Sequence, residues 1–498
     1  MNVNPITRLD YPDPDVIRVE DTYYMVSTTM HFMPGCEILQ SFDLVHWEHA
    51  TYVYETLDHT DAQQLKSGQN IYGQGMWAAS LRYHEGRFWI CFVANDTRKT
   101  YLYTSEKIDG PWKKQLIEGF YHDGSLLFDE DGRNYIVYGN DEIWITELNE
   151  DLTAPKKDGL HRLLVSDHKN PELGYEGSHI QKINGYYYIF LIHSLRDRWM
   201  RTEACFYSDS LEGEFTGGDV LCDDRGYCGQ GVAQGGIVDT PDGKWYAMLF
   251  QDSGAVGRIP ILLPVTWKDH FPFFGQNGHV PEEIEVHSTR PGYIYQPLVG
   301  SDDFCNGLLP RWQFNHDPDP RYYHLDALQG TYTITTREVC TELTQAVNTL
   351  TQRMSYPSCA AEVTVDASAL KEGDVAGLCA LQSCYAAVGI TKHHGKYEVL
   401  MLDKKEDGIL DMTEGTVVES HQMDFRLEAD FCNMKDEARC YYRVNKGDWL
   451  PIGTVHKLYF KLDHFTGCRF GLFCYAAEET GGSACFRDFK YYDVDEIS

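Results

Sequence analysis

The sequence predicts an all-β protein with two domains, a five-bladed β-propeller followed by a β-sandwich. The first observation is a segment that recurs five times between residues 13 and 250, each time as a head residue, a short strand, a turn and an aromatic strand. The second is a change of pattern near residue 300, after which short alternating strands follow one another without a helical period. At 498 residues, the chain is long enough for two to four domains.

The five segments share one spacing, because the head residue stands nine positions before the turn residue in each. Successive heads are 46 to 64 residues apart, about the length of one four-stranded propeller blade with its loops. Glycine at four of the five turns suits a tight hairpin that needs positive φ. The head and turn residues are Asp13 and Thr22, Trp77 and Gly86, Asp123 and Gly132, Glu176 and Gly185, and Gln234 and Gly243.

The five heads are predicted to ring one end of a central channel, because the blades of a propeller are related by rotation about its axis. Three carboxylates, Asp13, Asp123 and Glu176, would then share a pocket with Trp77 and Gln234. A single acid at a strand start often only caps the strand or forms a salt bridge. Three acids that face one space favour catalysis.

The acidic composition argues against nucleic acids and membranes as binding partners. Acidic residues outnumber basic ones by 75 to 43, for a formal net charge of -32, and such a surface repels phosphate backbones and anionic membranes. We therefore expect no nucleic-acid or membrane partner, and no apolar run approaches the roughly 18 residues of a membrane span. The charge suits a neutral substrate, although it can also serve solubility alone. Aromatic residues make up 13% of the chain, which favours strands and surfaces that stack on sugars.

The N-terminus and the cysteines bear on location. Residues 1–5 contain neither a basic region nor an apolar core, so no signal peptide is predicted. The 15 cysteines form no Cys-x-x-Cys pair, and so many thiols without an export signal indicate a reducing cytoplasm. A mature chain from which a signal had been removed would look the same. The oligomeric state stays open, and a homo-oligomer is compatible with the sequence.

The domain boundary is predicted between residues 298 and 299. Two segments rich in proline and glycine, Pro291–Tyr293 and Pro297–Gly300, are typical of a linker. Residues 1–298 then form the propeller and residues 299–498 the sandwich. The sandwich is predicted from short alternating stretches separated by glycine-containing loops, at 330–334, 360–365 and 397–401.

Paired carboxylates indicate hydrolysis of a glycosidic bond. This reaction needs a proton for the leaving oxygen and a nucleophile at the anomeric carbon, and two carboxyl groups supply both. A third acid beside the proton donor disfavours ionisation of that donor and keeps it protonated near neutrality. Attack by water inverts the configuration and requires the two carboxyl groups to be roughly 6.5–9.5 Å apart, a distance that sequence cannot measure.

Several motifs carry a resemblance to a known family. The opening Pro12–Pro14, with His122–Leu126 and Tyr175–His179, resembles the three motifs of glycoside hydrolase family 43. Other segments are similar to its β-xylosidase and α-L-arabinofuranosidase branch, which carries a C-terminal β-sandwich of the concanavalin-like, jelly-roll type. They are Val256–Pro260, Pro264–Trp267 and Asn348–Arg353. The resemblance covers nearly the whole chain, and the ordered motifs are highly specific together.

The resemblance implies roles for the three acids. The family fold is a five-bladed propeller, which agrees with the count of repeats, and its members invert the anomeric configuration. Carried over to this sequence, Asp13 would be the general base that activates water. Glu176 would be the general acid that protonates the leaving sugar, and Asp123 would orient Glu176 and raise its pKa.

The resemblance also implies a set of substrate-binding residues. Phe32 and Met33 match the segment that walls the −1 subsite, and Arg258 matches an arginine that binds substrate hydroxyls. Trp77 would be an apolar platform for a pentose ring. Two alternatives stay open, because Trp77 could belong to the core and Arg258 could form a surface salt bridge. Gln234 is expected to face the same space as the acids.

The Gln234 position also bears on metal binding. Many relatives place a histidine there that holds a metal or a water in the channel, and Ser253 also stands where a histidine is expected. A neutral glutamine is the weaker metal ligand. We therefore expect that no cofactor is required, with a structural calcium doubtful and the metal ligands unknown.

The leading interpretation is an exo-acting, inverting glycoside hydrolase that releases terminal pentose from xylan- or arabinoxylan-derived oligosaccharides. Which pentose is preferred, β-D-xylose or α-L-arabinofuranose, stays open because the two place similar hydroxyl groups. An endo-arabinanase-like hydrolase needs an open groove, against which the second domain argues. A non-catalytic carbohydrate-binding propeller would not need three acids. A retaining hydrolase on a similar propeller is a further alternative.

Overall fold

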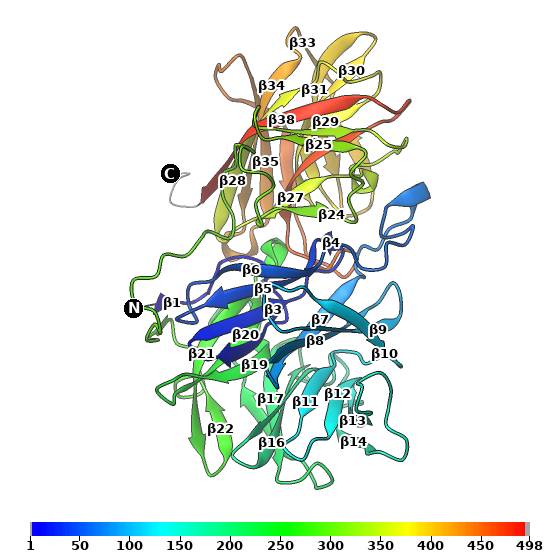
Figure 1. The fold of residues 1–498 in the computed structure, drawn as a ribbon. Coiled ribbons are helices and arrows are strands. Elements are labelled where there is room, and N and C mark those ends of the chain that lie inside the picture. The colour runs from blue at the N-terminus through cyan, green and yellow to red at the C-terminus, as the bar shows by residue number, and fades with distance from the viewer. Residues whose placement is uncertain (1, 494–498) are drawn as a thin grey trace.

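The computed structural model describes residues 2–493 and consists almost entirely of β-strands (Figure 1). Its helices are single 3-10 turns, and in this part of the chain no helix is long and apolar enough to cross a bilayer. The propeller lies below and the sandwich above in Figure 1. The two-domain, all-β fold predicted from the sequence is confirmed. The 3-10 turns are η1 (Lys66–Gly68), η2 (Gly254–Val256), η3 (Leu343–Gln345) and η4 (Cys432–Met434).

The propeller has five blades, each an antiparallel sheet of four strands, nearly all in chain order. The first blade is β2 (Asp15–Val19), β3 (Thr22–Ser27), β5 (Gly35–Ser41) and β6 (Glu48–Tyr54), and the second is β7 (Met76–His84), β8 (Arg87–Ala94), β9 (Lys99–Ser105) and β10 (Lys113–Ile117). The third is β11 (Ser125–Phe128), β12 (Asn134–Asn140), β13 (Glu142–Leu148) and β14 (His161–Ser166). The fourth is β15 (Glu176–Ile183), β16 (Tyr186–Ser194), β17 (Arg201–Ser208) and β18 (Thr216–Leu221). The fifth is β19 (Ala233–Asp239), β20 (Trp245–Asp252), β21 (Arg258–Lys268) and β22 (Phe271–Phe274), and β1 (Asn2–Val3) pairs with β23 (Glu283–Ile284) beside the blades.

The hairpin turns explain why the repeat is visible in the sequence. Gly185 has a φ of +85°, a conformation that costs glycine little and L-residues more. One spacing differs from the prediction, because Val19 pairs with Thr22 and the turn of the first blade is therefore residues 20–21. Thr22 already belongs to β3. The head Asp13 thus stands eight positions before its turn residue, two residues outside β2.

The five inner strands close around a polar axis. Arg82 of β7 reaches across the channel, where its Nη1 donates to Asp15 Oδ2 at 2.8 Å and its Nη2 to Ser125 Oγ at 2.7 Å. Nη2 also lies 3.1 Å from the carbonyl oxygen of Ile180, so one guanidinium joins four inner strands. The ring closes between the first and last blades, where Arg18 Nη2 lies 2.5 Å from Asp239 Oδ2.

The sandwich packs two antiparallel sheets face to face around one large apolar core. One sheet has nine strands: β32 (Leu410–Met412), β31 (Lys396–Lys404), β30 (Ala386–His393), β29 (Val375–Leu381), β37 (Arg469–Tyr475), β27 (Leu350–Arg353), β24 (Gln313–Asn315) and β4 (Phe32–Met33), with β33 (Thr416–Val418) beside β31. The other has seven: β25 (Tyr323–Asp326), β26 (Thr331–Thr335), β38 (Ser483–Asp493), β28 (Ser358–Asp366), β34 (Gln422–Asp430), β35 (Glu437–Val444) and β36 (Leu450–Lys457).

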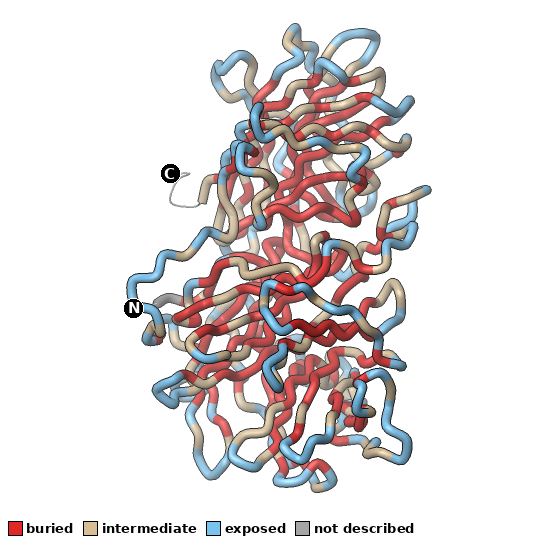
Figure 2. The backbone as a smooth tube through the Cα atoms, viewed as in Figure 1, coloured by how far each residue is buried: buried red, intermediate tan, exposed pale blue. Residues whose placement is uncertain are grey.

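The two domains share a sheet. The short strand β4 comes from the first blade, yet it pairs with β24 of the sandwich, with Asn315 opposite Phe32. Figure 2 shows that buried residues continue across this junction from one domain into the other. The boundary predicted at residues 298 and 299 lies in the segment between β23 and β24, which contains no strand.

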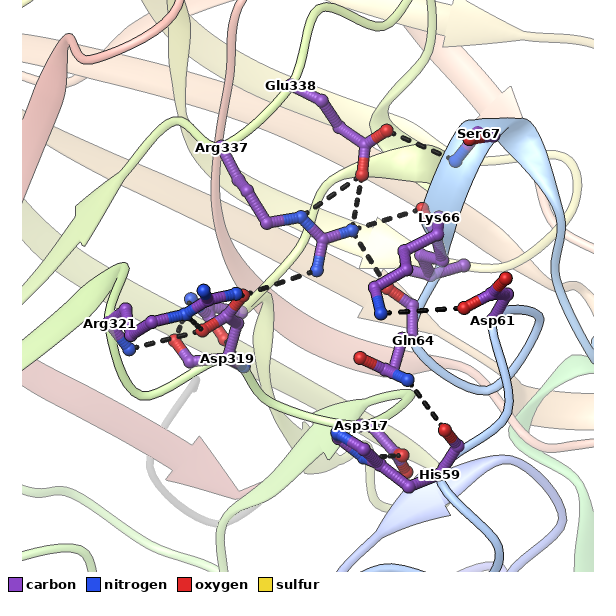
Figure 3. Close-up of polar contacts among 12 residues, drawn as sticks. His59, Asp61, Gln64, Lys66, Ser67, Asp317, Asp319, Arg321, Arg337 and Glu338 are labelled. Atoms are coloured by element: carbon purple, nitrogen blue, oxygen red, sulfur yellow. Dashed lines mark hydrogen bonds and ion pairs between the residues drawn. The ribbon is translucent and has the colours of Figure 1, made fainter.

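Polar contacts also hold the junction together. Figure 3 shows the loop between the first two blades against the sandwich, where His59 Nδ1 lies 2.7 Å from Asp317 Oδ2. In the same view, Arg337 Nη2 donates to the carbonyl oxygen of Gln64 at 2.9 Å. Deeper in the junction, Arg353 of the sandwich pairs with Glu37 of the propeller at 2.9 Å, and both side chains are buried. The sandwich is thereby fixed over one mouth of the propeller channel.

Candidate active site

The topology of the blades brings particular residues to the covered mouth. In each antiparallel blade the first strand begins at this mouth, the second ends there and the third begins there. Asp13 and Asp123 lie in the loops just before β2 and β11, and Glu176 is the first residue of β15. Asn140 ends β12, and Arg258 begins β21. Five residues that are far apart in the sequence therefore meet at one place.

Asp13 is held by donors at both carboxylate oxygens. Its backbone has a φ of +53°, which turns the buried side chain out of the strand direction. Thr28 Oγ1 donates to Oδ2 at 2.6 Å, and Arg258 Nη1 donates to Oδ1 at 3.0 Å. A carboxylate that accepts two such bonds is oriented and ready to accept a proton from water.

Asp123 is a buried acid among other acids. The backbone N–H of Gly177 donates to its Oδ2 at 2.9 Å. Burial, with the charges of Glu176 and Asp13 adding to it, raises the pKa of Asp123 to about 6, although the neighbouring His122 opposes the shift. A carboxylate oxygen of Asp123 lies within 4.8 Å of one of Glu176, which places these two predicted acids in one site.

His122 lies between two of the acids. Its Nε2 is 3.5 Å from Asp123 Oδ2 and 3.5 Å from Glu176 Oε2. Burial disfavours the charged ring, but the carboxylates outweigh it and raise the His122 pKa to about 9, so the ring is cationic at neutral pH. Asn140 Nδ2 donates to the same Glu176 oxygen at 2.9 Å. The Glu176 side chain is 22% exposed, which leaves it accessible to a substrate oxygen.

Neither of two possible places offers a good metal site. His122, Asp123 and Glu176 bring one ligand atom each within 4.8 Å of one another, but the raised pKa of His122 means that its ring would have to lose a proton before it could bind a metal. Calcium in the channel would need six to eight oxygen ligands. At the axis, Asp15 already accepts from Arg82 and lies 3.0 Å from His179 Nδ1. The residues present therefore do not fit a channel calcium.

The other predicted binding residues occupy three different environments. Trp77 lines the cavity beside Glu176. Arg258 is buried and bonds Asp13, so it is not a surface salt bridge. The backbone N–H of Gln234 donates to Glu203 Oε2 at 2.7 Å, and its side chain lies against Gly177.

Phe32 and Met33 are not brought into the cavity. Both are buried in β4, where they join the propeller to the sandwich. The Phe32 ring lies under the guanidinium of Arg469, with 3.5 Å between the guanidinium carbon and the ring centroid. The expectation that Phe32 and Met33 wall the −1 subsite is therefore corrected. Because β4 pairs with β24, these two residues lie in the junction between the domains and not in the cavity.

A cavity of about 750 Å³ opens beside Glu176 between the propeller and the sandwich. The sandwich contributes Met434, Asp436, the consecutive residues Lys457–Leu462, and Phe465. The rings of Phe465 and Trp77 have centroids 5.5 Å apart, and the Arg258 guanidinium lies under Phe465. Phe465 of the sandwich therefore covers the part of the cavity beside Trp77 and Arg258.

Comparison with known proteins agrees with this architecture. The model of "Glycosyl hydrolases family 43" matches residues 3–272. This chain belongs to glycosyl hydrolase family 43. The "Beta xylosidase C-terminal Concanavalin A-like domain" matches residues 301–492, so the resemblance noted in the sequence is confirmed for both domains. Membership of family 43 makes the protein a glycosidase.

Individual relatives cover nearly the whole chain. A solved Bacteroides eggerthii structure, described as "Bifunctional GH43-CE", is 42% identical with a TM-score of 0.92 over 99% of this chain and 64% of that one. This chain thus spans less than two thirds of that relative. The "Beta-xylosidase" of Formosa agariphila is 26% identical over 99% of this chain and 89% of its own length. The "Xylosidase/arabinosidase 43B" of Humicola insolens is 26% identical over 98% and 96%.

Sequence reasoning missed two parts of this family 43 site. His122 was visible only as the neighbour of Asp123 in a motif, and nothing local showed that its ring would lie between two acids. The sandwich residues were missed as well. Their signal is the aromatic stretch 459–465, which contains Tyr459, Phe460 and Phe465 within seven residues.

Proposed function

We propose that this family 43 glycosidase is exo-acting and inverting, and that it releases terminal β-D-xylose or α-L-arabinofuranose from xylan-derived oligosaccharides. The names of its relatives include both a β-xylosidase and a xylosidase/arabinosidase. The observation that carries the exo assignment is the contact between Trp77 and Phe465, whose ring centroids are 5.5 Å apart. A polysaccharide chain cannot pass between these two rings, and this supports a substrate that ends in the cavity.

The geometry supports attack by water. Asp13 would take a proton from a water molecule while the oxygen of that water forms a bond to the anomeric carbon. The bond between that carbon and the leaving oxygen breaks, and Glu176 donates its proton to the leaving oxygen. Asp123 and His122 would influence whether Glu176 carries a proton. The His122 ring lies 3.5 Å from a carboxylate oxygen of each acid. Displacement of the leaving group by water on the opposite face inverts the configuration.

We further propose that catalysis uses no resident metal. The support is the Arg82 guanidinium, which occupies the axis and satisfies Asp15 and Ser125. Treatment with a chelator should leave kcat/KM on a nitrophenyl pentoside unchanged. A loss of activity that calcium restores would overturn this part of the proposal.

Two measurements test the main proposal. Xylobiose and arabinoxylan oligosaccharides are incubated with the enzyme, and the released monosaccharides show which pentose is taken. Proton NMR of the first-formed sugar reports the anomer, and a β-xyloside should yield α-xylose first if the reaction inverts. Release of mixed long oligosaccharides from arabinan would favour the endo alternative. Absence of hydrolysis on every pentoside would favour a carbohydrate-binding propeller.

A further inference from the structure

Asp10, a buried aspartate three residues before the predicted base, binds backbone amides from both domains. The side chain is buried, and each carboxylate oxygen accepts one N–H. The N–H of Arg258 donates to Oδ1 at 2.7 Å, and the N–H of Gly467 donates to Oδ2 at 2.8 Å. Because Arg258 belongs to the propeller and Gly467 to the sandwich, this one carboxylate joins the two domains.

Two glycines leave room for the Asp10 carboxylate. A Cβ atom on Gly257 would lie 2.3 Å from Asp10 Oδ1. A Cβ atom on Gly467 would lie 2.8 Å from the Asp10 Cβ and 2.1 Å from the carbonyl oxygen of Val256. These distances are too short for any side chain, so glycine is needed on both sides of Asp10. The two domains can therefore approach this carboxylate closely enough for both amides to bind it.

Arg258 is held at its backbone as well as at its side chain. Its N–H donates to Asp10, and its carbonyl oxygen accepts from the N–H of Tyr11 at 3.0 Å. Its guanidinium donates through Nη1 to Asp13 Oδ1 at 3.0 Å and through Nη2 to the carbonyl oxygen of Phe465 at 3.3 Å. The backbone bonds fix the point from which the side chain starts. They thereby fix the guanidinium relative to the Asp13 carboxylate.

Asp10 also holds the sandwich segment that covers part of the cavity. Phe465 and Gly467 lie just before β37, and Phe465 lines the cavity. The next residue, Cys468, donates its N–H to the carbonyl oxygen of Ala255 at 2.8 Å, so consecutive residues of this segment are bonded to the propeller. Because Asp10 accepts from Gly467, the position of the Phe465 ring depends on the same carboxylate that holds the Arg258 backbone.

We propose that Asp10 is a positioning residue, which couples the docked sandwich to the orientation of the base Asp13 through Arg258. The inference rests on the proposed function and deepens it, because it makes the activation of water depend on contacts between the domains. Asp10 would act only through its neighbours and take no part in proton transfer. A misplacement of about 1 Å near the reacting groups can cost roughly a hundredfold in rate, so a lost bond at Asp10 should be visible in kcat.

Asp10→Asn tests this coupling with little change in shape. An amide offers only one acceptor oxygen, so the variant loses the bond to either Arg258 or Gly467. We expect kcat to fall roughly tenfold to a hundredfold. The loss should be equal on xylobiose and on 2,4-dinitrophenyl xyloside, or on the corresponding arabinosides, because the base is needed whatever the leaving group is.

Asp302→Asn is the matched control. Asp302 is a buried aspartate of the sandwich that also accepts two N–H bonds, from Phe304 N at 2.7 Å and from Trp312 Nε1 at 2.8 Å. Its replacement removes one bond of the same kind away from Asp13. We expect both variants to lose similar stability in urea unfolding, but Asp302→Asn should keep kcat within about threefold of the wild-type value.

A double-mutant cycle separates positioning from a general loss of stability. Arg258→Leu removes the guanidinium through which Asp10 would act, so adding Asp10→Asn to it should lower kcat less than about twofold further. Independent effects would instead multiply. If they multiply, or if Asp10→Asn lowers kcat no more than Asp302→Asn does, the inference is overturned while the hydrolase assignment stands.

Gly467→Ala keeps the test decisive if Asp10→Asn folds poorly. The added methyl group would push the sandwich segment away from Asp10 and leave the carboxylate itself unchanged. We expect the same loss of kcat on both substrates, in a protein whose circular dichroism matches that of wild type. An unchanged kcat in the folded variant would contradict the inference. A wild-type enzyme that cleaves no pentoside would refute the proposed function, and the inference with it.

Discussion

The guanidinium of Arg258 in the propeller lies 4.2 Å from the centroid of the Phe465 ring in the sandwich. The same guanidinium donates to Asp13 Oδ1, so the residue that covers the cavity also packs on the residue that holds the predicted base. The second domain is therefore part of the catalytic site. Its removal would expose Arg258 to water and weaken its hold on Asp13.

Phe465→Ala should open the closed end of the cavity. We expect KM on a disaccharide to rise about tenfold and kcat to fall, because the sugar loses an apolar contact and Arg258 loses the ring that restrains it. Steady-state kinetics on xylobiose measure both values. Leu328→Ala, at a sandwich position that is 94% exposed, is the control and should behave as wild type. Unchanged kinetics for Phe465→Ala would show that the sandwich has no part in the site.

Glu176→Gln tests the proton donor. We expect kcat to fall by roughly 10²–10⁴-fold on xylobiose, whose leaving oxygen needs a proton, and by much less on 2,4-dinitrophenyl xyloside, whose leaving group does not. Asp13→Asn is the matched comparison, because loss of the base should slow both substrates alike. A uniform loss in Glu176→Gln would assign Glu176 to another role.

His122 should make the stability of the site depend on pH. Burial opposes the charged ring, but the carboxylates raise its pKa to about 9, above the value of 6.5 expected in the unfolded chain. A group whose folded pKa is raised contributes stability that is complete below pH 6.5 and is lost as the pH rises through about 9. We expect His122→Gln to lower the free energy of unfolding by about 2–3 kcal/mol at pH 7 and by much less at pH 10.

Urea unfolding of wild type and His122→Gln at both pH values measures this difference. Asn140→Ala, which removes the other donor to Glu176 without removing a titrating group, is the control for loss of a neutral contact. The two variants should differ in their pH dependence. If His122→Gln loses the same free energy at pH 7 and pH 10, the ring is not a cation in the folded protein.

A cluster of three buried histidines at the domain junction should give stability the opposite pH dependence to that of His122. His31 and His316 are fully buried and His464 nearly so, with the Tyr72 ring stacked 3.9 Å from that of His464. Burial lowers the pKa of His464 to about 3, and it lowers that of His31 well below the ordinary range, with the charges of His316 and His464 adding to the effect. The unfolded chain then binds more protons below pH 6.5, so stability must fall as the pH drops from 6.5 towards 3.

His31→Phe should relieve part of this loss. Neither ring nitrogen of His31 makes a hydrogen bond of normal geometry with the described residues, so an apolar ring of similar shape sacrifices little. We expect a Tm at pH 5 a few degrees above that of wild type, and no loss at pH 7.5. Differential scanning calorimetry at both pH values measures this, with the exposed His287→Gln as control. A variant that is less stable at pH 5 would contradict the prediction.

Much of the fold could be predicted because it is repeated along the chain. Each blade is a run of consecutive strands, so head, turn and strand recur at nearly constant spacing and reveal the propeller without any long-range information. The same rotation placed Asp13, Asp123 and Glu176 at one mouth, as the structure shows. The single error of spacing is at Thr22, which pairs with Val19 and therefore belongs to β3 and not to the turn.

The site beyond the acids could not be predicted in the same way. Phe32 and Met33 pair with β24, which lies nearly 300 residues further along the chain, and Phe465 meets Trp77 across almost 400 residues. The order of the chain does not say which loop of the sandwich will reach which blade. His122 needs the third and fourth blades to be adjacent before its ring can lie between two acids.

The sequence by itself determined the two domains, the five blades and the three carboxylates, since local periodicity and turn residues encode them. Only the tertiary structure decided which residues of the sandwich cover the cavity and that His122 lies between two acids, which raise its pKa. The physical reason is that burial and electrostatic environment belong to a side chain's neighbours in space, and these come from segments that the chain order keeps far apart.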